Sequence, residues 1–393
     1  MSRSKSQPVP GPRAETLVSA QTLVSAYERA GYERAHPGIL QPAEPFLDLS
    51  GEDIRSRMFL TSGQAGEELC LRPDFTIPVS RDYLASASAG QAKGFCYLGP
   101  VFRDRGTLPG EFLQAGIESF GRTDKAAADA DTLALALETS AHFGRPAPDL
   151  RIGDVGLFSA LVAALDLAPA WKRRLVKDFN RRASLEQDLD RLTLGTATGR
   201  PEYQGVLAAM AGADPKAAHA LVTDLLSIAG ITAVGGRSVA EIADRFLEQS
   251  TLGASAALPP YTRTLVERFL AVSGNPLEAS AAMRQLASDG GIVLTPTLDL
   301  FDARNVELTK RGVDLTRVTF SSAFGRGMDY YTGFVFEMTD GTAAEPLVAG
   351  GRYDDLMTRL GSPSPIPAVG FSVWVERFAG SSVAGSSVAG GAA

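Results

Sequence analysis

The chain has 393 residues, of which 45% are hydrophobic and 21% are charged. It is long enough for two structural units and can bury a large core, so a disordered or collagen-like protein is excluded. Its 38 Lys and Arg against 45 Asp and Glu give a net charge of -7, which argues against a protein that works by neutralising nucleic-acid phosphates.

The chain ends and the cysteines bear on where the protein works. Two cysteines in a chain of this length favour a reducing cytoplasm, although a disulfide between them stays open, and with only three histidines they cannot form a metal cluster. No apolar run reaches the roughly 18 residues that span a bilayer. Residues 1–13 predict a disordered leader rather than a secretory signal, and residues 379–393 predict a low-complexity tail. We expect a cytoplasmic protein without metal, cofactor or membrane contact, folded over residues 14–378.

The first part of the fold is predicted to hold one helix and several short strands. Apolar residues at helical spacing predict a helix over residues 14–35, which the His-Pro-Gly sequence at 36–38 ends. Three short strand candidates follow, at residues 45–48, 57–61 and 68–71.

The remaining elements alternate between strands and helices. Residues 94–103 and 111–121 have strand length and composition, and residues 129–143 predict a helix. From about 150 to 292 Ala and Leu dominate at helical spacing, which predicts a helical insertion. Strand character returns at residues 291–300, 317–325, 333–340 and 367–375. We therefore expect an α+β fold, an antiparallel sheet flanked by helices and interrupted by the insertion.

The strand at 111–121 carries the most informative pattern for function. Alternation places Gln114 and Glu118 on one face, with Gly116 between them. A carboxylate and an amide so placed suit a small zwitterionic or imidazole-bearing ligand. The alternative is an ordinary strand whose polar face meets solvent.

Two further segments carry candidate binding residues. Arg103, at the end of the neighbouring strand, could hold a carboxylate or phosphate, or could form a surface ion pair with Asp104 or Glu111. In the segment from 325 to 337, glycines bracket Arg326, and Tyr330 and Tyr331 follow, which suits an aromatic-sized pocket.

The basic run at 171–182 could suggest RNA binding. Acidic residues at 186, 188 and 190 offset its charge, as is usual on a solvated helix. The sequence has no P-loop, no GxGxxG opening a helix, no HExxH and no GxSxG elbow, so these nucleotide, zinc and hydrolase sites are not expected.

Taken in order, the segments resemble the catalytic core of class II histidyl-tRNA synthetases. YERAHPGILQPAEPFLDLSGEDI resembles motif 1, LRPDFTIPVSR the family's LRPE-type segment, and GFCYLGPVFRDRG with EFLQAGIESFG motif 2. GRGMDYYTGFVFE and VAGGRYDDL resemble the two histidine-specific signatures, and PAVGFSVWVERF resembles motif 3.

The resemblance implies a histidine pocket and a homodimer formed through the motif 1 region, with Ile39, Leu40, Phe46 and Leu47 as its apolar surface. Asp74 and Gln114 would hold the ammonium group, while Glu118 and Tyr331 would face the imidazole. The residues that match pocket positions, with Arg103 of motif 2 added, are Asp74, Thr76, Arg103, Gln114, Glu118, Arg326, Tyr330 and Tyr331.

Departures from the synthetase pattern change the expected function. Only residues 378–393 follow Arg377, where a synthetase carries an anticodon-binding domain. The loop at 104–110, which faces ATP in the family, is short and nearly without positive charge. Asp74 stands in place of the LRPE glutamate, and Val375 replaces a small residue beside the nucleotide.

With the histidine pocket kept and these features lost, the chain is similar to the regulatory subunits of ATP phosphoribosyltransferase. That similarity implies a non-catalytic subunit that joins a short-form catalytic subunit in the first step of histidine biosynthesis. L-histidine would be its feedback effector, and it would bind neither nucleic acid nor a membrane. The alternative is a truncated histidine-activating enzyme related to the synthetases.

Overall fold

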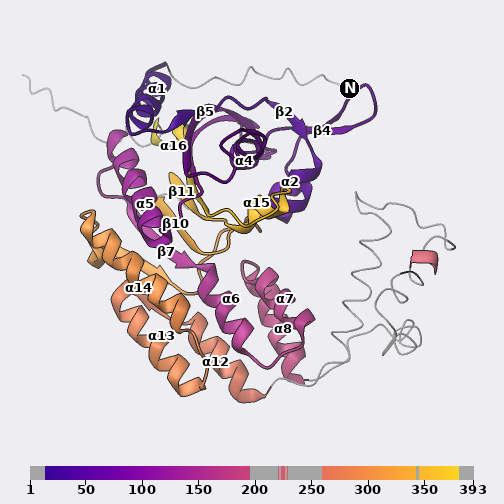
Figure 1. Cartoon of the computed structure of the whole chain (residues 1–393), viewed down its shortest axis with the longest axis vertical. Coiled ribbons are helices and arrows are strands. Elements are labelled where there is room, and N and C mark those ends of the chain that lie inside the picture. The colour runs from indigo at the N-terminus through magenta and orange to yellow at the C-terminus, as the bar shows by residue number, and fades with distance from the viewer. Residues whose placement is uncertain are drawn as a thin grey trace, which may run out of the picture. The chain divides into compact units, whose positions relative to one another are not determined.

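The computed structural model describes residues 14–194, 259–341 and 345–379, with residues 220, 223–225 and 228 (Figure 1). The expected leader, the tail from residue 380 and the middle of the expected insertion lie outside the described residues, so those predictions stay predictions. The chain divides into two compact units. Unit 1 comprises residues 1–157, 271–285 and 294–393, and unit 2 comprises 158–270 and 286–293.

A nine-stranded sheet forms the centre of unit 1, in the order β1-β5-β6-β12-β11-β10-β7-β9-β8. The strands are β1 Glu33–Arg34, β5 Lys93–Phe102, β6 Glu111–Phe120, β12 Ala368–Trp374, β11 Val348–Arg352, β10 Phe334–Thr339, β7 Asp149–Asp154, β9 Val318–Ser321 and β8 Ser273–Gly274. Only the β1–β5 and β7–β9 pairs in this sheet are parallel. A second sheet pairs β2 Leu40–Pro42, β4 Glu68–Leu71 and β3 Leu60–Ser62. The expected α+β class with a largely antiparallel sheet is confirmed.

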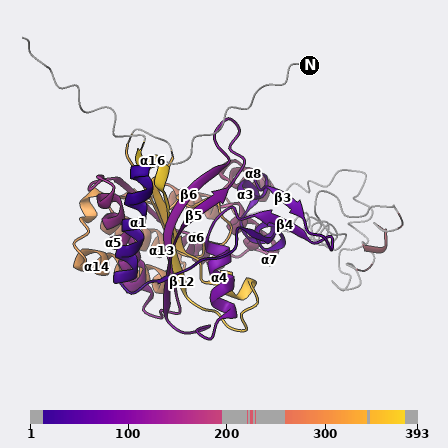
Figure 2. The same ribbon diagram turned by 90° about the horizontal axis from the view of Figure 1, so that it is seen from above.

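Helices cover both faces of the large sheet. Helices α1 (Ala14–Arg29) and α5 (Lys125–His142) lie on one side of β5 and β6, and α4 (Thr76–Ala85) lies on the other (Figure 2). Helix α14 (Thr295–Lys310) packs on α5. Shorter helices of this unit are α2 Glu44–Leu49, α3 Glu52–Arg55, α15 Asp355–Arg359, α16 Val375–Ala379 and the 3-10 turn η2 Leu315–Arg317.

Unit 2 is helical over its described residues. It contains α7 (Pro169–Asp178), α8 (Arg182–Leu194) and α12 (Pro260–Leu270), while α6 (Val155–Ala164) and α13 (Pro276–Gly290) span the division between the units. Apolar side chains at helical spacing form its core, where the rings of Phe158 and Phe179 stack 4.6 Å apart. The insertion was expected to begin at about residue 150, but that residue lies inside β7, so the helical part begins after the strand ends at Asp154.

Three expected elements are wrong. Helix α1 ends at Arg29 instead of residue 35, because Gly31 takes φ +93° and its N–H closes the turn on Glu28. Residues 45–48 lie in α2, and residues 295–300 open α14, although both were expected to be strands. A proline stands in the first turn of each of these helices, where its fixed φ favours a helix start.

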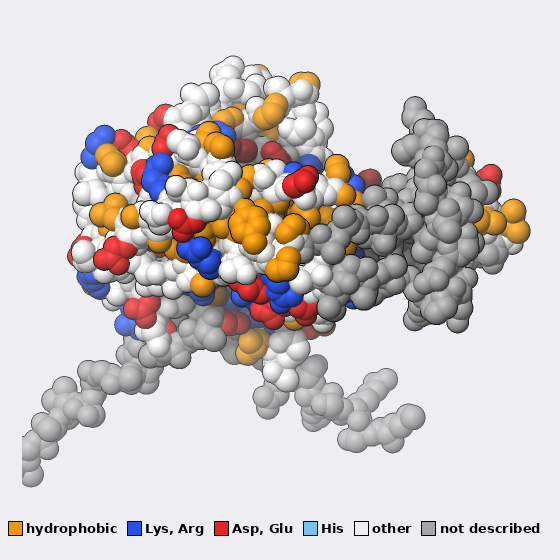
Figure 3. Space-filling view, turned by 90° about the horizontal axis from the view of Figure 1, so that it is seen from below, with side chains coloured by type: hydrophobic (Ala, Val, Ile, Leu, Met, Phe, Trp, Pro, Cys, Tyr) orange, Lys and Arg blue, Asp and Glu red, His pale blue; other side chains and the backbone are white. Residues whose placement is uncertain are grey.

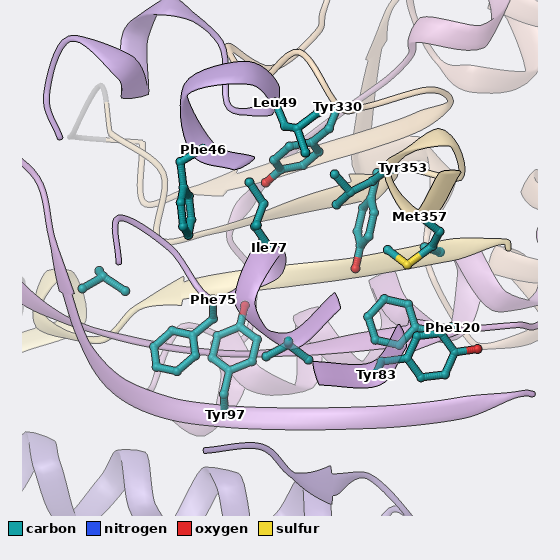
Figure 4. Packing of buried hydrophobic residues seen from close by; sticks show 14 of the residues in the cluster. Phe46, Leu49, Phe75, Ile77, Tyr83, Tyr97, Phe120, Tyr330, Tyr353 and Met357 are labelled. Carbon is teal, nitrogen blue, oxygen red and sulfur yellow. The ribbon is translucent and has the colours of Figure 1, made fainter. Parts of the chain in front are cut away.

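One core cluster of unit 1 lies between α4 and the sheet (Figure 4). Phe75 stacks on Tyr97 at 4.4 Å, and Tyr83 stacks on Phe120 at 4.5 Å, so α4 is fixed over β5 and β6 by aromatic pairs. The two cysteines are free and buried, without a disulfide between them. No helix of the described residues is long and apolar enough to cross a membrane.

Candidate functional site

The polar face of β6 is buried beneath the core of unit 1. Gln114 and Glu118 are each 1% exposed, so the alternative of a strand face open to solvent is wrong. The neighbouring strand β12 places Gly370 directly opposite Glu118. A Cβ at Gly370 would lie 1.9 Å from the Glu118 carboxylate, so glycine is required there for the carboxylate to keep its position.

Three hydroxyl groups hold the Glu118 carboxylate. Thr76 Oγ1 donates to Oε1 at 2.7 Å and Tyr97 Oη donates to the same oxygen at 3.4 Å, while Tyr353 Oη donates to Oε2. Burial raises the pKa of Glu118 to about 8, against the lowering effect of these hydrogen bonds. The sequence predicted Thr76 and Glu118 but not the two tyrosines. Their signal was present, because Tyr97 and Tyr353 lie in GFCYLGPVFR and VAGGRYDDL, two segments that carry the resemblance.

Tyrosines form one wall of this site. The ring centroid of Tyr330 lies 4.9 Å from that of Tyr331 and 5.7 Å from that of Tyr353, and Tyr331 and Tyr353 are 6.4 Å apart. In Figure 4, the hydroxyls of Tyr330 and Tyr353 point inward from one side and the Tyr97 hydroxyl points inward from the other. The tyrosine cluster therefore has one more member, Tyr353, than the pair in the sequence motif, and the expected aromatic pocket stays a prediction.

Charged and polar side chains around this wall keep atoms without partners. The buried atoms that lack a hydrogen bond include Asp74 Oδ2, Arg103 Nη2, Gln114 Oε1 and Arg326 Nε. Burial raises the pKa of Asp74, and the nearby Arg103 opposes that shift. A buried polar atom without a partner costs free energy, so these acceptors and donors together suit a ligand that carries both an ammonium and a carboxylate.

Arg103 does not form the surface ion pair considered above. It is only 9% exposed, its Nε donates to the Pro73 carbonyl at 2.7 Å, and its guanidinium lies 5.7 Å from the Phe112 ring. Arg326 lies 3.5 Å from the Glu337 carboxylate and 5.9 Å from the Trp374 ring. Both arginines thus lie in the interior, beside the tyrosines and Asp74.

A cavity of about 470 Å³ adjoins Arg103 on the motif 2 side. Its lining consists of Ser56, Arg57, Arg103, Asp104, Arg105, Gly106, Leu108, Phe112, Glu345, Trp374 and Arg377. Arg377 already pairs with Glu345 at 2.8 Å and donates to the Pro346 carbonyl. Burial, with the nearby Arg105, Arg103 and Arg326, lowers the pKa of Arg377 to about 10, against the raising effect of Glu345. The motif 3 arginine is therefore engaged by protein groups.

Charges elsewhere on the described chain are largely paired. The basic run of unit 2 forms ion pairs such as Arg174–Asp188 at 2.5 Å and Arg182–Glu186 at 2.8 Å. On the face drawn in Figure 3, basic and acidic side chains of the described residues are interspersed. Within the ranges that the structure describes, no group of three His, Cys, Asp or Glu side chains could hold a metal ion.

Comparisons with known proteins agree with this architecture. The sequence model of the histidyl-tRNA synthetase family matches residues 12–234 and 219–378. Curated relatives from Brucella canis and Brucella suis, named ATP phosphoribosyltransferase regulatory subunit, are 38% identical over 342 residues, which is 86% of this chain and 90% of theirs.

Solved structures show the same fold. One from Bacillus halodurans C, described as an ATP phosphoribosyltransferase regulatory subunit/histidyl-tRNA synthetase, is 20% identical with a TM-score of 0.61 and covers 96% of this chain and 83% of its own. The histidyl-tRNA synthetase from Nostoc sp. PCC 7120 is 17% identical with a TM-score of 0.62, and the match covers 97% of this chain and 75% of the synthetase chain. The chain belongs to the histidyl-tRNA synthetase-like family of ATP phosphoribosyltransferase regulatory subunits.

Proposed function

We propose that this chain is a non-catalytic subunit that activates a short-form ATP phosphoribosyltransferase in the first step of histidine biosynthesis. We also propose that it mediates feedback inhibition by L-histidine. The name shared by its relatives supports the catalytic subunit as its partner. The main observation in favour of histidine as the effector is the set of buried atoms without hydrogen bonds on Asp74, Gln114, Arg103 and Arg326, around the tyrosine wall. The free thiols suit assembly of this complex in the cytoplasm.

Histidine matches the chemistry of this site. Asp74 Oδ2 and Gln114 Oε1 are acceptors for the ammonium group, and the free nitrogens of Arg103 and Arg326 are donors for the carboxylate. The imidazole would then lie against Glu118 and Tyr331, where a carboxylate can accept its N–H and an aromatic ring can pack on its face.

Adenylation of the amino acid is disfavoured by the groups on the motif 2 side. Transfer from ATP needs cations that stabilise the triphosphate and the charge that develops on it. The loop at 104–110 has a single cation, Arg105, and its guanidinium lies 4.7 Å from the Phe112 ring. Arg377 is paired with Glu345. These contacts support a regulatory role over the alternative of a truncated histidine-activating enzyme.

The alternative keeps two observations in its favour. The cavity on the motif 2 side is lined by four arginines, Arg57, Arg103, Arg105 and Arg377. Arg103 and Arg326 each retain a buried nitrogen without a partner, and a phosphate could accept from both. Pyrophosphate exchange distinguishes the two functions, because only an activating enzyme catalyses it.

Complementation tests the proposed function directly. The full-length chain is mixed with a short-form ATP phosphoribosyltransferase that is inactive alone, and product formation is followed with and without L-histidine. We expect the mixture to be active and histidine to inhibit it. A mixture that stays inactive while the two chains are shown to associate would overturn the activating role. An active mixture whose rate of product formation is unchanged by L-histidine would overturn the effector role.

A further inference from the structure

A cluster of bonds lies directly beside the site, at the point where β11 ends. Successive residues of a strand point to opposite faces, so Arg352 and Tyr353 point away from each other. Tyr353 donates to Glu118 in the site. Arg352 is 3% exposed on the other face, and its Nε donates to Asp129 in α5 at 2.8 Å.

Asp354 connects the end of β11 to three other segments. Its backbone N–H donates to Thr332 Oγ1 at 3.0 Å. Its carboxylate accepts from Arg352 Nη1 at 2.9 Å and from the Ala368 N–H at 2.9 Å, and it pairs with Lys125 at 2.7 Å. The Thr332 N–H in turn donates to the Arg352 carbonyl at 2.9 Å.

These bonds join the two chain segments that supply the tyrosine wall. Thr332 directly follows Tyr331, and Asp354 directly follows Tyr353. We name the bonds among Thr332, Arg352 and Asp354 the tyrosine latch. Because it fixes the backbone beside each ring, the latch determines how Tyr331 and Tyr353 are placed relative to Glu118. Hydrogen bonds weaken steeply when donor and acceptor shift or tilt, so a small displacement would loosen the contacts to an imidazole.

We propose that Asp354 is a positioning residue for ligand recognition, which acts through the tyrosine latch and sets the preference of the site for an imidazole side chain. The inference rests on the proposed function, since it takes histidine as the ligand. Asp354 makes its contribution from outside the site: its described side-chain contacts are with Arg352, Lys125 and Ala368.

Two substitutions weaken the latch with little change in shape. Asp354→Asn removes the negative charge that faces Arg352 and Lys125, and Thr332→Val removes the hydroxyl that accepts from the Asp354 N–H. If Asp354→Asn does not fold, Thr332→Val alone still tests whether the latch affects ligand binding. Asp355→Asn is the matched control, because Asp355 is exposed in the first turn of α15.

Calorimetric titration of the full-length chain with L-histidine and with β-(2-thienyl)-L-alanine tests the proposal. The second ligand has the same backbone and a ring of similar size without N–H groups. We expect each latch variant to bind histidine roughly three- to ten-fold more weakly, the effect of about one hydrogen bond. Affinity for the thienyl ligand should stay within two-fold of wild type, and Asp355→Asn should match wild type for both ligands.

The outcomes separate this inference from the proposed function. If wild type binds histidine but both latch variants keep its affinity, or lose affinity for both ligands equally, Asp354 is not a positioning residue and the proposed function stands. If wild type binds no histidine, the effector role fails and the inference fails with it.

Discussion

Glu118 shows how a single carboxyl can be both buried and held in place. Its oxygens accept from Thr76, Tyr97 and Tyr353, and it is 1% exposed. Removal from water disfavours the charged form more strongly than the hydroxyls favour it, and the pKa rises to about 8. Near neutral pH the free protein therefore carries much of Glu118 in its protonated form. A cationic ligand group beside it would favour release of that proton.

The raised pKa predicts a pH-dependent stability. An unfolded glutamate has a pKa of 4.5, so the folded chain holds this proton more tightly. Protonated Glu118 therefore stabilises the folded chain. This stabilisation is fully present below pH 4.5 and is lost as the pH rises to about 8, by about 1.4 kcal/mol for each pH unit between these values. When urea unfolding is measured at pH 5 and at pH 8.5, the free energy of unfolding of wild type should fall by several kcal/mol more between the two pH values than that of Glu118→Gln. The control is Glu111→Gln, at an exposed glutamate, which should show the same pH dependence as wild type. If wild type and Glu118→Gln lost the same stability between the two pH values, the prediction would be contradicted.

Removing imidazole contacts predicts weaker feedback. Loss of a hydrogen bond to a charged group costs about 1.5–3 kcal/mol, which is roughly ten-fold to more than a hundred-fold in affinity. Glu118→Ala should therefore raise the histidine concentration that halves the activity of the assembled phosphoribosyltransferase by at least ten-fold. Tyr331→Ala, which removes the ring proposed to pack on the imidazole, should raise it as well. Glu111→Ala, at the exposed start of the same strand, is the control. Unchanged inhibition in both variants would place the effector site elsewhere.

At the scale of elements, the strands were predicted better than the helix starts. Strand β6 was recovered because aromatic and aliphatic residues mark it along its length, and β4 matches the expected residues. The apolar runs that open α2 and α14 predicted strands, because a short apolar run has no clear period, whereas the proline in the first turn of each favours a helix start. Local patterns thus failed where a short apolar run stood alone, as in α2, and where such a run opened a long helix, as in α14.

The site was predictable in its residues but not in its burial. Alternation correctly placed Gln114 and Glu118 on one face of β6, but which face is covered depends on α4, whose residues are distant in the sequence. The resemblance supplied the other members of the site. Tyr97 and Tyr353 were missed because each lies in a matched segment without a chemical pattern of its own.

Two helices and two strands are joined by a buried ionic network, which predicts a large loss of stability when one charge is removed. Arg304 of α14 is 1% exposed and pairs with Asp154 at 2.5 Å and with Asp129 of α5 at 3.4 Å. Arg304→Met leaves the carboxylates of this network under-compensated, so it should lower the free energy of unfolding by about 3–5 kcal/mol. Arg284→Met, which removes a surface arginine paired with Asp299 and Asp302, should cost much less, because solvent screens surface ion pairs. Equal losses in urea unfolding would contradict this account.

The motif 2 loop predicts that the chain lacks an activating step. Arg105 is the only cation between residues 104 and 110, and Arg377 is engaged by Glu345. We expect no histidine-dependent exchange of labelled pyrophosphate into ATP above a control without protein, whereas an authentic histidyl-tRNA synthetase assayed in parallel should be active. Exchange clearly above that control would establish the alternative function.

At the scale of the whole molecule, apolar side chains remain exposed on the small sheet of unit 1. Leu40 is 51% exposed on β2, Leu60 is 50% exposed on β3, and Ile39 beside β2 is 44% exposed. Phe46 was expected to join this surface but is fully buried in the core, so that part of the prediction is wrong. Leu47 is partly buried, and its place in the surface stays a prediction. On β4, Leu40 is opposite Leu71 and Leu60 is opposite Cys70, so the two leucines point to opposite faces of the small sheet. The exposed apolar surface of the motif 1 region therefore consists of Ile39 and Leu40.

This surface predicts a homodimer that also assembles with the catalytic subunit. In an isologous interface each exposed residue is buried against the same patch of the partner, so a single substitution removes two contacts. A charge buried in such a patch is unfavourable, so Leu40→Glu should shift the chain toward monomer at micromolar concentration, while wild type sediments as a dimer. Val306→Glu, a change at an exposed apolar residue of α14, controls for a general effect of added charge. A monomeric wild type would rule out the dimer, and a dimeric Leu40→Glu variant would place its interface away from this surface.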